Sequence, residues 1–128
     1  MEQNPLEDHF HRPRNAGPMD RPDIDVQAEN PVCGDLLRLY LKLGKDRRVA
    51  GASFQAYGCP AAIAAGSVLT ELSVGCGPAD LAAIREKTID SALGGLSGEK
   101  AHAAVLAADV AAKAAAAFPR GGAGAAPG

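Results

Sequence analysis

Apolar and polar residues alternate over residues 37–43, where leucine takes every second position and arginine, tyrosine and lysine stand between. A period of two predicts a strand with one buried face. The polar run GKDRR at 44–48 predicts a turn, and a weaker alternation predicts a second strand over 49–57, so that the two form an antiparallel hairpin. The residues expected to share the buried face of this second strand are Ala50, Ala52, Phe54 and Ala56.

Spacings close to four residues predict helices on both sides of the hairpin. Leu6 and Phe10 indicate a short helix over 4–12, which Pro13 ends. After the hairpin, helices are expected over 60–74, 78–86, 88–94 and 97–118. In the last of these an apolar stripe recurs every fourth residue and should pack on the sheet. Its members are Leu106, Val110, Ala114 and Phe118.

The order of these elements predicts an α+β fold with a small antiparallel sheet of about three strands and helices packed on one face. The third strand is expected at an edge, where Ile24 and Val26 alternate within a proline-rich loop. We expect one domain over residues 1–118. The tail over 119–128 has no large apolar side chain to bury and is expected to be disordered.

Composition narrows the function classes. Thirteen basic and fifteen acidic residues give a net charge of −2, without a basic stripe, which disfavours nucleic-acid binding. Neither a signal peptide nor a membrane span is recognisable, so a cytoplasmic protein without membrane contact is expected. The odd number of three widely spaced cysteines indicates reduced thiols, and therefore metal binding or thiol chemistry.

The cysteines differ in local setting. Cys59 precedes Pro60 at the start of a predicted helix, where backbone amides favour a thiolate, so it should ionise more easily than a free thiol. Cys33 and Asp35 flank a glycine and could face one point, although a cysteine in a turn is also a common structural residue. Cys76 stands at a helix stop and is left out of the site.

The histidines by themselves are weak candidates. His102 is one turn into the last predicted helix and would by itself be read as an exposed residue near a helix start. His9 and His11 are two positions apart, cannot share a helix face, and have no cysteine close to them in sequence. Neither is therefore expected to bind metal.

Several motifs together resemble the iron–sulfur cluster assembly scaffolds of the IscU/NifU N-terminal type over residues 8–118. The first comprises Asp8-His9-Phe10, Pro13-Arg14-Asn15 and Gly17, and the next two are Cys33-Gly34-Asp35 and Tyr57-Gly58-Cys59. The resemblance implies the scaffold fold and makes His9 a structural residue. It also implies one ligand set for iron, zinc or a 2Fe–2S cluster. That set is Cys33, Asp35, Cys59 and His102.

One family motif departs from the pattern. Family members carry Leu-Pro-Pro-Val-Lys and then a hydrophobic residue before His-Cys, whereas residues 96–103 read LSGEKAHA. Loss of the Pro-Pro-Val core argues against recognition by the specialised Hsp70-type chaperone. Ala103 replaces the third cysteine, which the family uses to accept sulfur, so Cys59 or Cys33 is expected to take sulfur instead, with Asp35 as the exchangeable iron ligand.

The resemblance implies a non-catalytic scaffold or carrier that holds a transient 2Fe–2S cluster or Zn²⁺. Its implied partners are a cysteine desulfurase, an iron donor and apo-proteins that accept the cluster. The alternative is a zinc-binding regulatory or adaptor protein that contacts a desulfurase without building clusters, because thiolate, imidazole and carboxylate all bind Zn²⁺. A Cys/His hydrolase or a dithiol redox enzyme is disfavoured, since the chain lacks a Cys-x-x-Cys pair.

Overall fold

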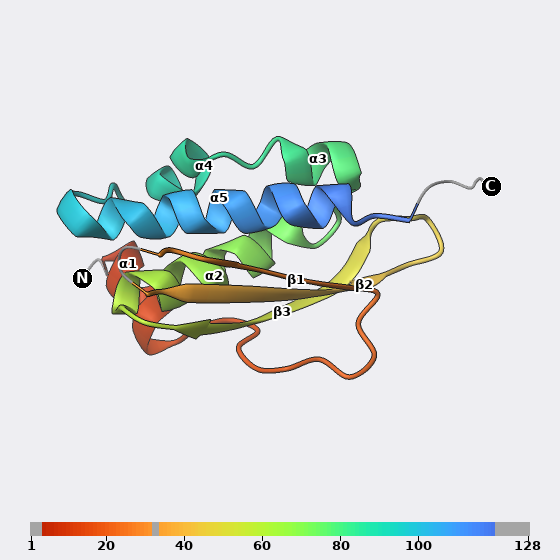
Figure 1. The fold of residues 1–128 in the computed structure, drawn as a ribbon, viewed down its shortest axis with the longest axis horizontal. Helices are drawn as coiled ribbons and strands as arrows, with labels where there is room; N and C mark the ends of the chain where they lie inside the picture. Colours follow the sequence, from red (N-terminus) through yellow and green to blue (C-terminus); the bar gives the residue numbers. More distant parts are fainter. Residues whose placement is uncertain (1–3, 32–33, 120–128) are drawn as a thin grey trace.

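The computed structural model describes residues 4–31 and 34–119, and over these it has the expected α+β architecture (Figure 1). The strands are β1 (Ile24–Glu29), β2 (Leu36–Leu43) and β3 (Val49–Tyr57). The helices are α1 (Pro5–His11), α2 (Pro60–Ser73), α3 (Pro78–Ala82), α4 (Glu86–Ala92), the 3₁₀ helix η1 (Gly98–Lys100) and α5 (Ala101–Ala116). No helix among these residues is long and apolar enough to cross a membrane. The predicted disordered tail lies outside the described residues except for Pro119.

The sheet is antiparallel throughout, in the order β1-β2-β3. In the central strand Leu37, Leu39 and Leu41 are fully buried, which confirms the face predicted from the alternating leucines. Leu39 lies between Val26 of β1 and Phe54 of β3, so one row of apolar side chains crosses the sheet. The residues between the leucines point to the opposite face of the sheet.

The predicted face of β3 is wrong at its first residue. Ala50 is exposed, and Val49 is buried in its place. The pairing register shifts there, because Leu43 pairs with Val49 whereas Lys42 pairs with Gly51, which leaves Ala50 as an extra residue. Such a bulge inverts the alternation on one side of it, so counting every second residue back from Phe54 reaches the wrong side chain.

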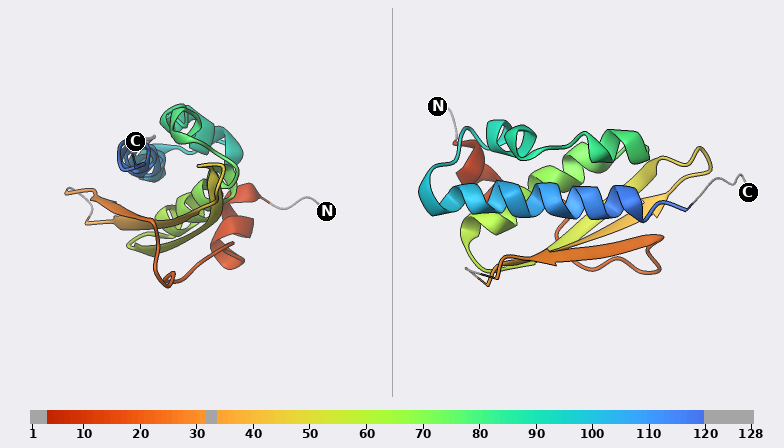
Figure 2. Two further views of the ribbon diagram at one scale, coloured as in Figure 1. Left: turned by 90° about the vertical axis from the view of Figure 1, so that its right-hand side faces the viewer. Right: turned by 45° about the horizontal axis from the view of Figure 1, so that its top comes forward.

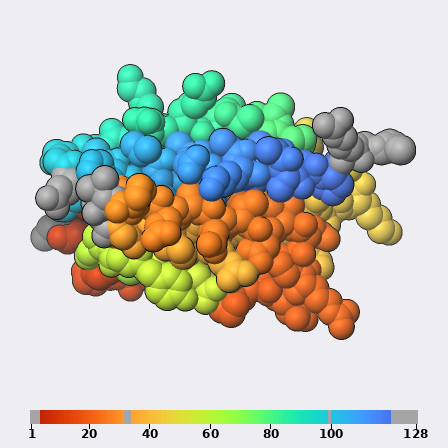
Figure 3. Space-filling model, viewed as in Figure 1, coloured from red at the N-terminus to blue at the C-terminus, as the bar shows by residue number. Residues whose placement is uncertain are grey.

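Both long helices pack on the leucine face of the sheet. α2 contacts β2 and β3, and α5 contacts β1 and β2. Figure 2 shows these helices on the same side of the sheet, with α3 and α4 against α5, and Figure 3 shows α5 lying along β1 at the surface. The predicted stripe of α5 is buried along its whole length: Leu106, Val110, Ala114 and Phe118 are all at most 8% exposed.

The helix boundaries differ from the prediction in two regions. The helix expected over 97–118 is divided into η1 and α5, and α5 ends at Ala116, before Phe118. The other difference lies between α3 and α4. α3 ends at Ala82 and α4 begins at Glu86, so the break comes earlier than expected. Ile84, in the connection, is 8% exposed and fills part of the core. The N–H of Arg85 donates to Thr88 Oγ1 at 3.1 Å, which fixes the start of α4.

The N-terminal segment is held against α2 by a polar network. His9 Nδ1 lies 2.7 Å from Ser67 Oγ, and the backbone N–H of Arg14 donates to the same hydroxyl at 2.8 Å. Asn15 Nδ2 donates to Thr70 Oγ1 at 3.0 Å. His9 thus contacts the interior of the domain, in agreement with a structural role.

Candidate functional site

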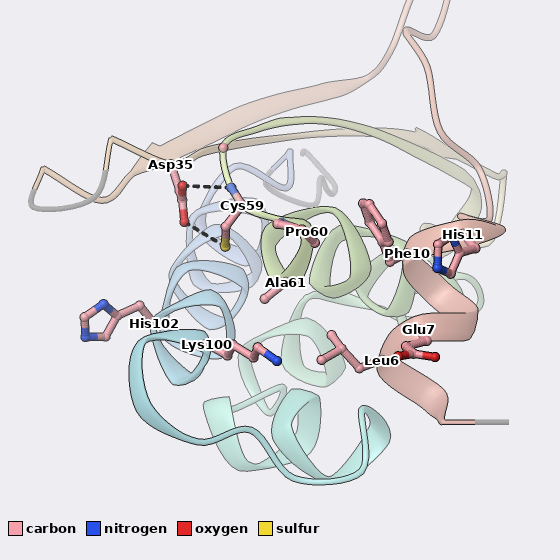
Figure 4. A pocket seen from close by; sticks show the side chains of 11 residues that line it. Leu6, Glu7, Phe10, His11, Asp35, Cys59, Pro60, Ala61, Lys100 and His102 are labelled. Carbon is pink, nitrogen blue, oxygen red and sulfur yellow. Dashed lines mark hydrogen bonds between the residues drawn. The ribbon is translucent and has the colours of Figure 1, made fainter.

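A cleft of about 930 Å³ opens at the end of the sheet where α1, the β3–α2 junction and the start of α5 meet (Figure 4). Leu6 and Phe10 of α1 line it on one side, and Lys100 and His102 on another. Asp35 and Cys59 line it as well. The cleft falls within the usual size of ligand sites and has a largely apolar wall with a few polar groups.

Asp35 and Cys59 form a hydrogen-bonded pair in the cleft. Asp35 precedes β2 and is only 6% exposed. Its Oδ1 accepts a hydrogen bond from the Cys59 backbone N–H at 3.1 Å, and its Oδ2 lies 3.4 Å from the Cys59 thiol, which donates to it. Gly58 permits this approach, since its φ is +128° and a Cβ there would lie 2.0 Å from Asp35 Oδ1.

The pKa of the Cys59 thiol is shifted in the opposite direction to that expected from its position at a helix start. Burial raises the pKa of the thiol, and the neighbouring Asp35 carboxylate raises it further. The backbone amides of Ala62 and Ala61 lower the pKa, but they are outweighed. The prediction of an easily ionised thiol was wrong, because it considered the helix N-terminus but neither the burial of the thiol nor its hydrogen bond to Asp35.

The four predicted ligands are only partly brought together. Asp35 and Cys59 are in contact, whereas the imidazole of His102 points away from them in Figure 4. Cys33 lies outside the described residues. Within the described part of the chain, no three side chains of histidine, cysteine, aspartate or glutamate are placed to hold one metal ion. The four-residue site therefore stays a prediction.

Ala103 and Cys76 both lie outside the group of candidate ligands in the cleft. Ala103, which the resemblance suggests as the counterpart of the family's third cysteine, is 1% exposed and faces the core of the domain. Cys76 lies beyond the opposite end of α2, where its thiol donates to the Leu72 carbonyl at 3.1 Å. A helix of fourteen residues, about 21 Å long, therefore separates Cys76 from Cys59.

The cleft is also lined by residues that the sequence analysis did not place in the site. Glu7, His11 and Lys100 all line it, together with Cys59. His11 was set aside because no cysteine is close to it in sequence, yet folding places α1 beside the N-terminus of α2. Only the packing of α1 on α2 reveals this, and no local motif could have done so.

Comparison with known proteins gives a consistent family. Residues 1–123 match the family described as NifU-like N terminal domain. The chain is 43% identical over 102 residues to the iron–sulfur cluster assembly scaffold protein IscU 1 of Archaeoglobus fulgidus, with 80% of the chain and 66% of that protein aligned. It thus spans slightly less than two thirds of that relative.

Two further relatives support the match. The scaffold protein IscU of Haemophilus influenzae is 37% identical over 105 residues, covering 80% of this chain and 82% of that protein. Among solved structures, the N-terminal NifU-like protein of Brucella abortus superposes with a TM-score of 0.71 over 91% of this chain and 92% of that one. At 17% identity this likeness establishes the fold alone.

Proposed function

This chain belongs to the family of NifU-like N-terminal domains, and from that premise we propose that it is a non-catalytic scaffold on which an iron–sulfur cluster is assembled and then passed on. The observation that carries the proposal is the Asp35–Cys59 pair, a thiol and a carboxylate in direct contact within an open cleft. Both residues belong to the motifs that the chain shares with cluster scaffolds.

We propose Cys33, Asp35, Cys59 and His102 as the ligands of the cargo. Thiolate, carboxylate and imidazole in this number match the terminal positions of a 2Fe–2S cluster. Replacing thiolates by harder ligands weakens the hold on iron, which suits a scaffold that must release its product. Binding requires Asp35 to release Cys59 and the His102 ring to turn toward them.

Sulfur transfer is proposed to use Cys59, because Ala103 has no thiol. A cysteine desulfurase would present a persulfide, whose outer sulfur the Cys59 thiolate attacks. A new S–S bond then forms on Cys59, the S–S bond of the donor breaks, and the donor cysteine leaves as a thiolate. Asp35 Oδ2, which already accepts the Cys59 hydrogen bond, is placed to take the thiol proton. Reducing this sulfur to sulfide requires an external electron donor.

The family's chaperone motif is proposed to be inactive here. Residues 98–100 form η1, and the N–H of Leu96 donates to Asp90 Oδ1 at 2.6 Å. This segment is therefore folded against the domain, and it lacks the prolines and valine of the family motif. We propose that an iron donor and apo-protein acceptors are partners, without a specialised Hsp70-type chaperone.

Anaerobic reconstitution tests the proposal. The protein is incubated with ferrous iron, cysteine, a cysteine desulfurase and dithiothreitol as the external electron donor, and its absorption and Mössbauer spectra are recorded. We expect a cluster in the natural chain and in Cys76→Ser, the matched control, and its loss in Cys33→Ser and Cys59→Ser. If the natural chain forms no cluster while Ala103→Cys acquires one, the proposal fails. Bound zinc that iron and sulfide cannot displace would favour the zinc adaptor instead.

A further inference from the structure

Two side chains that commonly bind metals stand one turn apart on α1, at the edge of the cleft. Glu7 and His11 both line the cleft that contains Asp35 and Cys59. Residues four apart on a helix share a face, with their Cβ atoms about 5–6 Å apart. In Figure 4, Phe10 lies between α1 and Pro60, whereas Glu7 and His11 lie close to the α1 ribbon, on the far side of the cleft from Asp35 and Cys59.

The exposed side chain of His11 contacts a neighbouring aromatic ring on the same helix. Its ring packs against the ring of Phe10, with centroids 4.9 Å apart and planes tilted by 58°. Phe10 in turn packs against the hydrophobic core. His9 is different, because its Nδ1 contacts Ser67 on α2 at 2.7 Å and is not available at the cleft.

The two acidic side chains of α1 differ in the same way as its two histidines. Asp8 is engaged by Arg14, whose Nη2 donates to Asp8 Oδ2 at 2.7 Å. Glu7 has no cation within ion-pair distance in the described part of the chain. Of the two histidines and the two acidic residues of α1, His9 and Asp8 are thus bound to other parts of the domain, whereas His11 and Glu7 line the cleft.

We propose that Glu7 and His11 form a capture site for Fe²⁺ at the outer edge of the cleft. Imidazole suits divalent iron, and carboxylate suits hard divalent cations. Two protein ligands with water in the remaining positions bind weakly and exchange quickly, as a transfer station requires. The ion remains ferrous and exchanges water and these two ligands for Asp35 and Cys59. This last transfer rests on the proposed scaffold function, whereas binding by Glu7 and His11 does not.

Paramagnetic Mn²⁺ gives the most direct test, because this ion prefers oxygen and nitrogen ligands to thiolate and so discriminates against Cys59. Mn²⁺ is titrated into the isotope-labelled apo-protein, and the broadening of each backbone amide signal is followed. We expect the amides of residues 6–12 to broaden first. Early broadening centred on Asp35, Cys59 and His102 would overturn the proposal.

Point variants supply the second arm of the test. Glu7→Gln and His11→Gln should each raise the Mn²⁺ concentration for half-maximal broadening about tenfold or more, since losing even a group that only supports a ligand costs roughly 10–100-fold in affinity. Glu86→Gln is the matched control, because Glu86 also stands in the first turn of a short helix. Unchanged titrations in both cleft variants would contradict the proposal.

The transfer step is tested separately from the scaffold function. In Cys59→Ser the Mn²⁺ titration at residues 6–12 should be unchanged even though cluster assembly is lost. Failure of the metal-capture proposal can therefore be told apart from failure of the scaffold proposal. With limiting Fe²⁺, Glu7→Gln should slow cluster formation several-fold, and saturating Fe²⁺ should restore the natural rate. Equal rates at limiting Fe²⁺ would show that iron does not pass through this site.

Discussion

Replacing Gly58 by alanine tests how closely the β3–α2 junction is coupled to Asp35. Gly58 has a φ of +128°, and an added Cβ would lie 2.0 Å from Asp35 Oδ1 and 2.7 Å from its Cγ. The carboxylate is buried, so it must turn away and lose its hydrogen bond from the Cys59 N–H. The variant therefore combines backbone strain with the breakage of the Asp35–Cys59 pair.

The expected cost has two parts. Backbone strain at such a φ costs about 1–3 kcal/mol, and a hydrogen bond to a charged group contributes about 1.5–3 kcal/mol. Gly58→Ala should thus lower the free energy of unfolding by about 3–5 kcal/mol. In an Asp35→Ala background only the strain remains, together with a close contact to the Cα of residue 35 at 3.0 Å, so the cost should fall to about 1–3 kcal/mol.

Urea unfolding of the two single variants and the double variant measures this coupling. Gly75→Ala is the matched control, because Gly75 also has a positive φ, +90°, but a Cβ added there would have no other atom within 4 Å. Its cost should equal the strain alone. If Gly58→Ala costs the same with and without Asp35, the coupling between the junction and the carboxylate is refuted.

Three further predictions concern the core, the thiol and α1. Gly66→Ala should destabilise the domain by about 1–2 kcal/mol in urea unfolding, because the added Cβ would lie 2.4 Å from the buried Phe54 ring. Overpacking costs about 1–3 kcal/mol, which outweighs the better helix propensity of alanine. Equal stability of the variant would show that the ring moves aside freely. Asp35→Asn should lower the pKa of Cys59, so alkylation of the Cys59 thiol should begin at lower pH, measured in a chain where Cys59 is the remaining cysteine. If the pH profile of alkylation does not change, burial alone raises the pKa. Ser67→Ala should lower the free energy of unfolding by about 1–3 kcal/mol and speed amide hydrogen exchange in α1, because His9 and the Arg14 N–H both lose their partner, the Ser67 hydroxyl. Unchanged, slow exchange in α1 would contradict the role of Ser67 in docking this helix.

The fold was largely predictable because its sheet is built from a regular pattern. The alternating leucines of β2 and the four-residue stripe of α5 each mark one buried face, and both faces are as predicted. The error at Ala50 has a local cause, since a bulge changes the pairing without changing the composition of the strand. No local residue pattern marks that shift.

The site was less predictable because its properties depend on contacts between distant segments. The helix start at Cys59 was visible in sequence, but the effect of Asp35 on its thiol depends on a 3.4 Å contact that only the folded chain creates. His11 is a similar case, since α1 reaches the cleft by docking its other face on Ser67. Local spacing cannot reveal either relation.

A cluster bound in part by Cys59 would be detected as iron and sulfide in protein purified from its native cell. The quantity to measure is the metal and acid-labile sulfide content after anaerobic purification from the native host. We expect iron and sulfide in equal amounts in the natural chain and neither in Cys59→Ser. Stoichiometric zinc without sulfide, retained when iron and sulfide are added, would contradict the scaffold function.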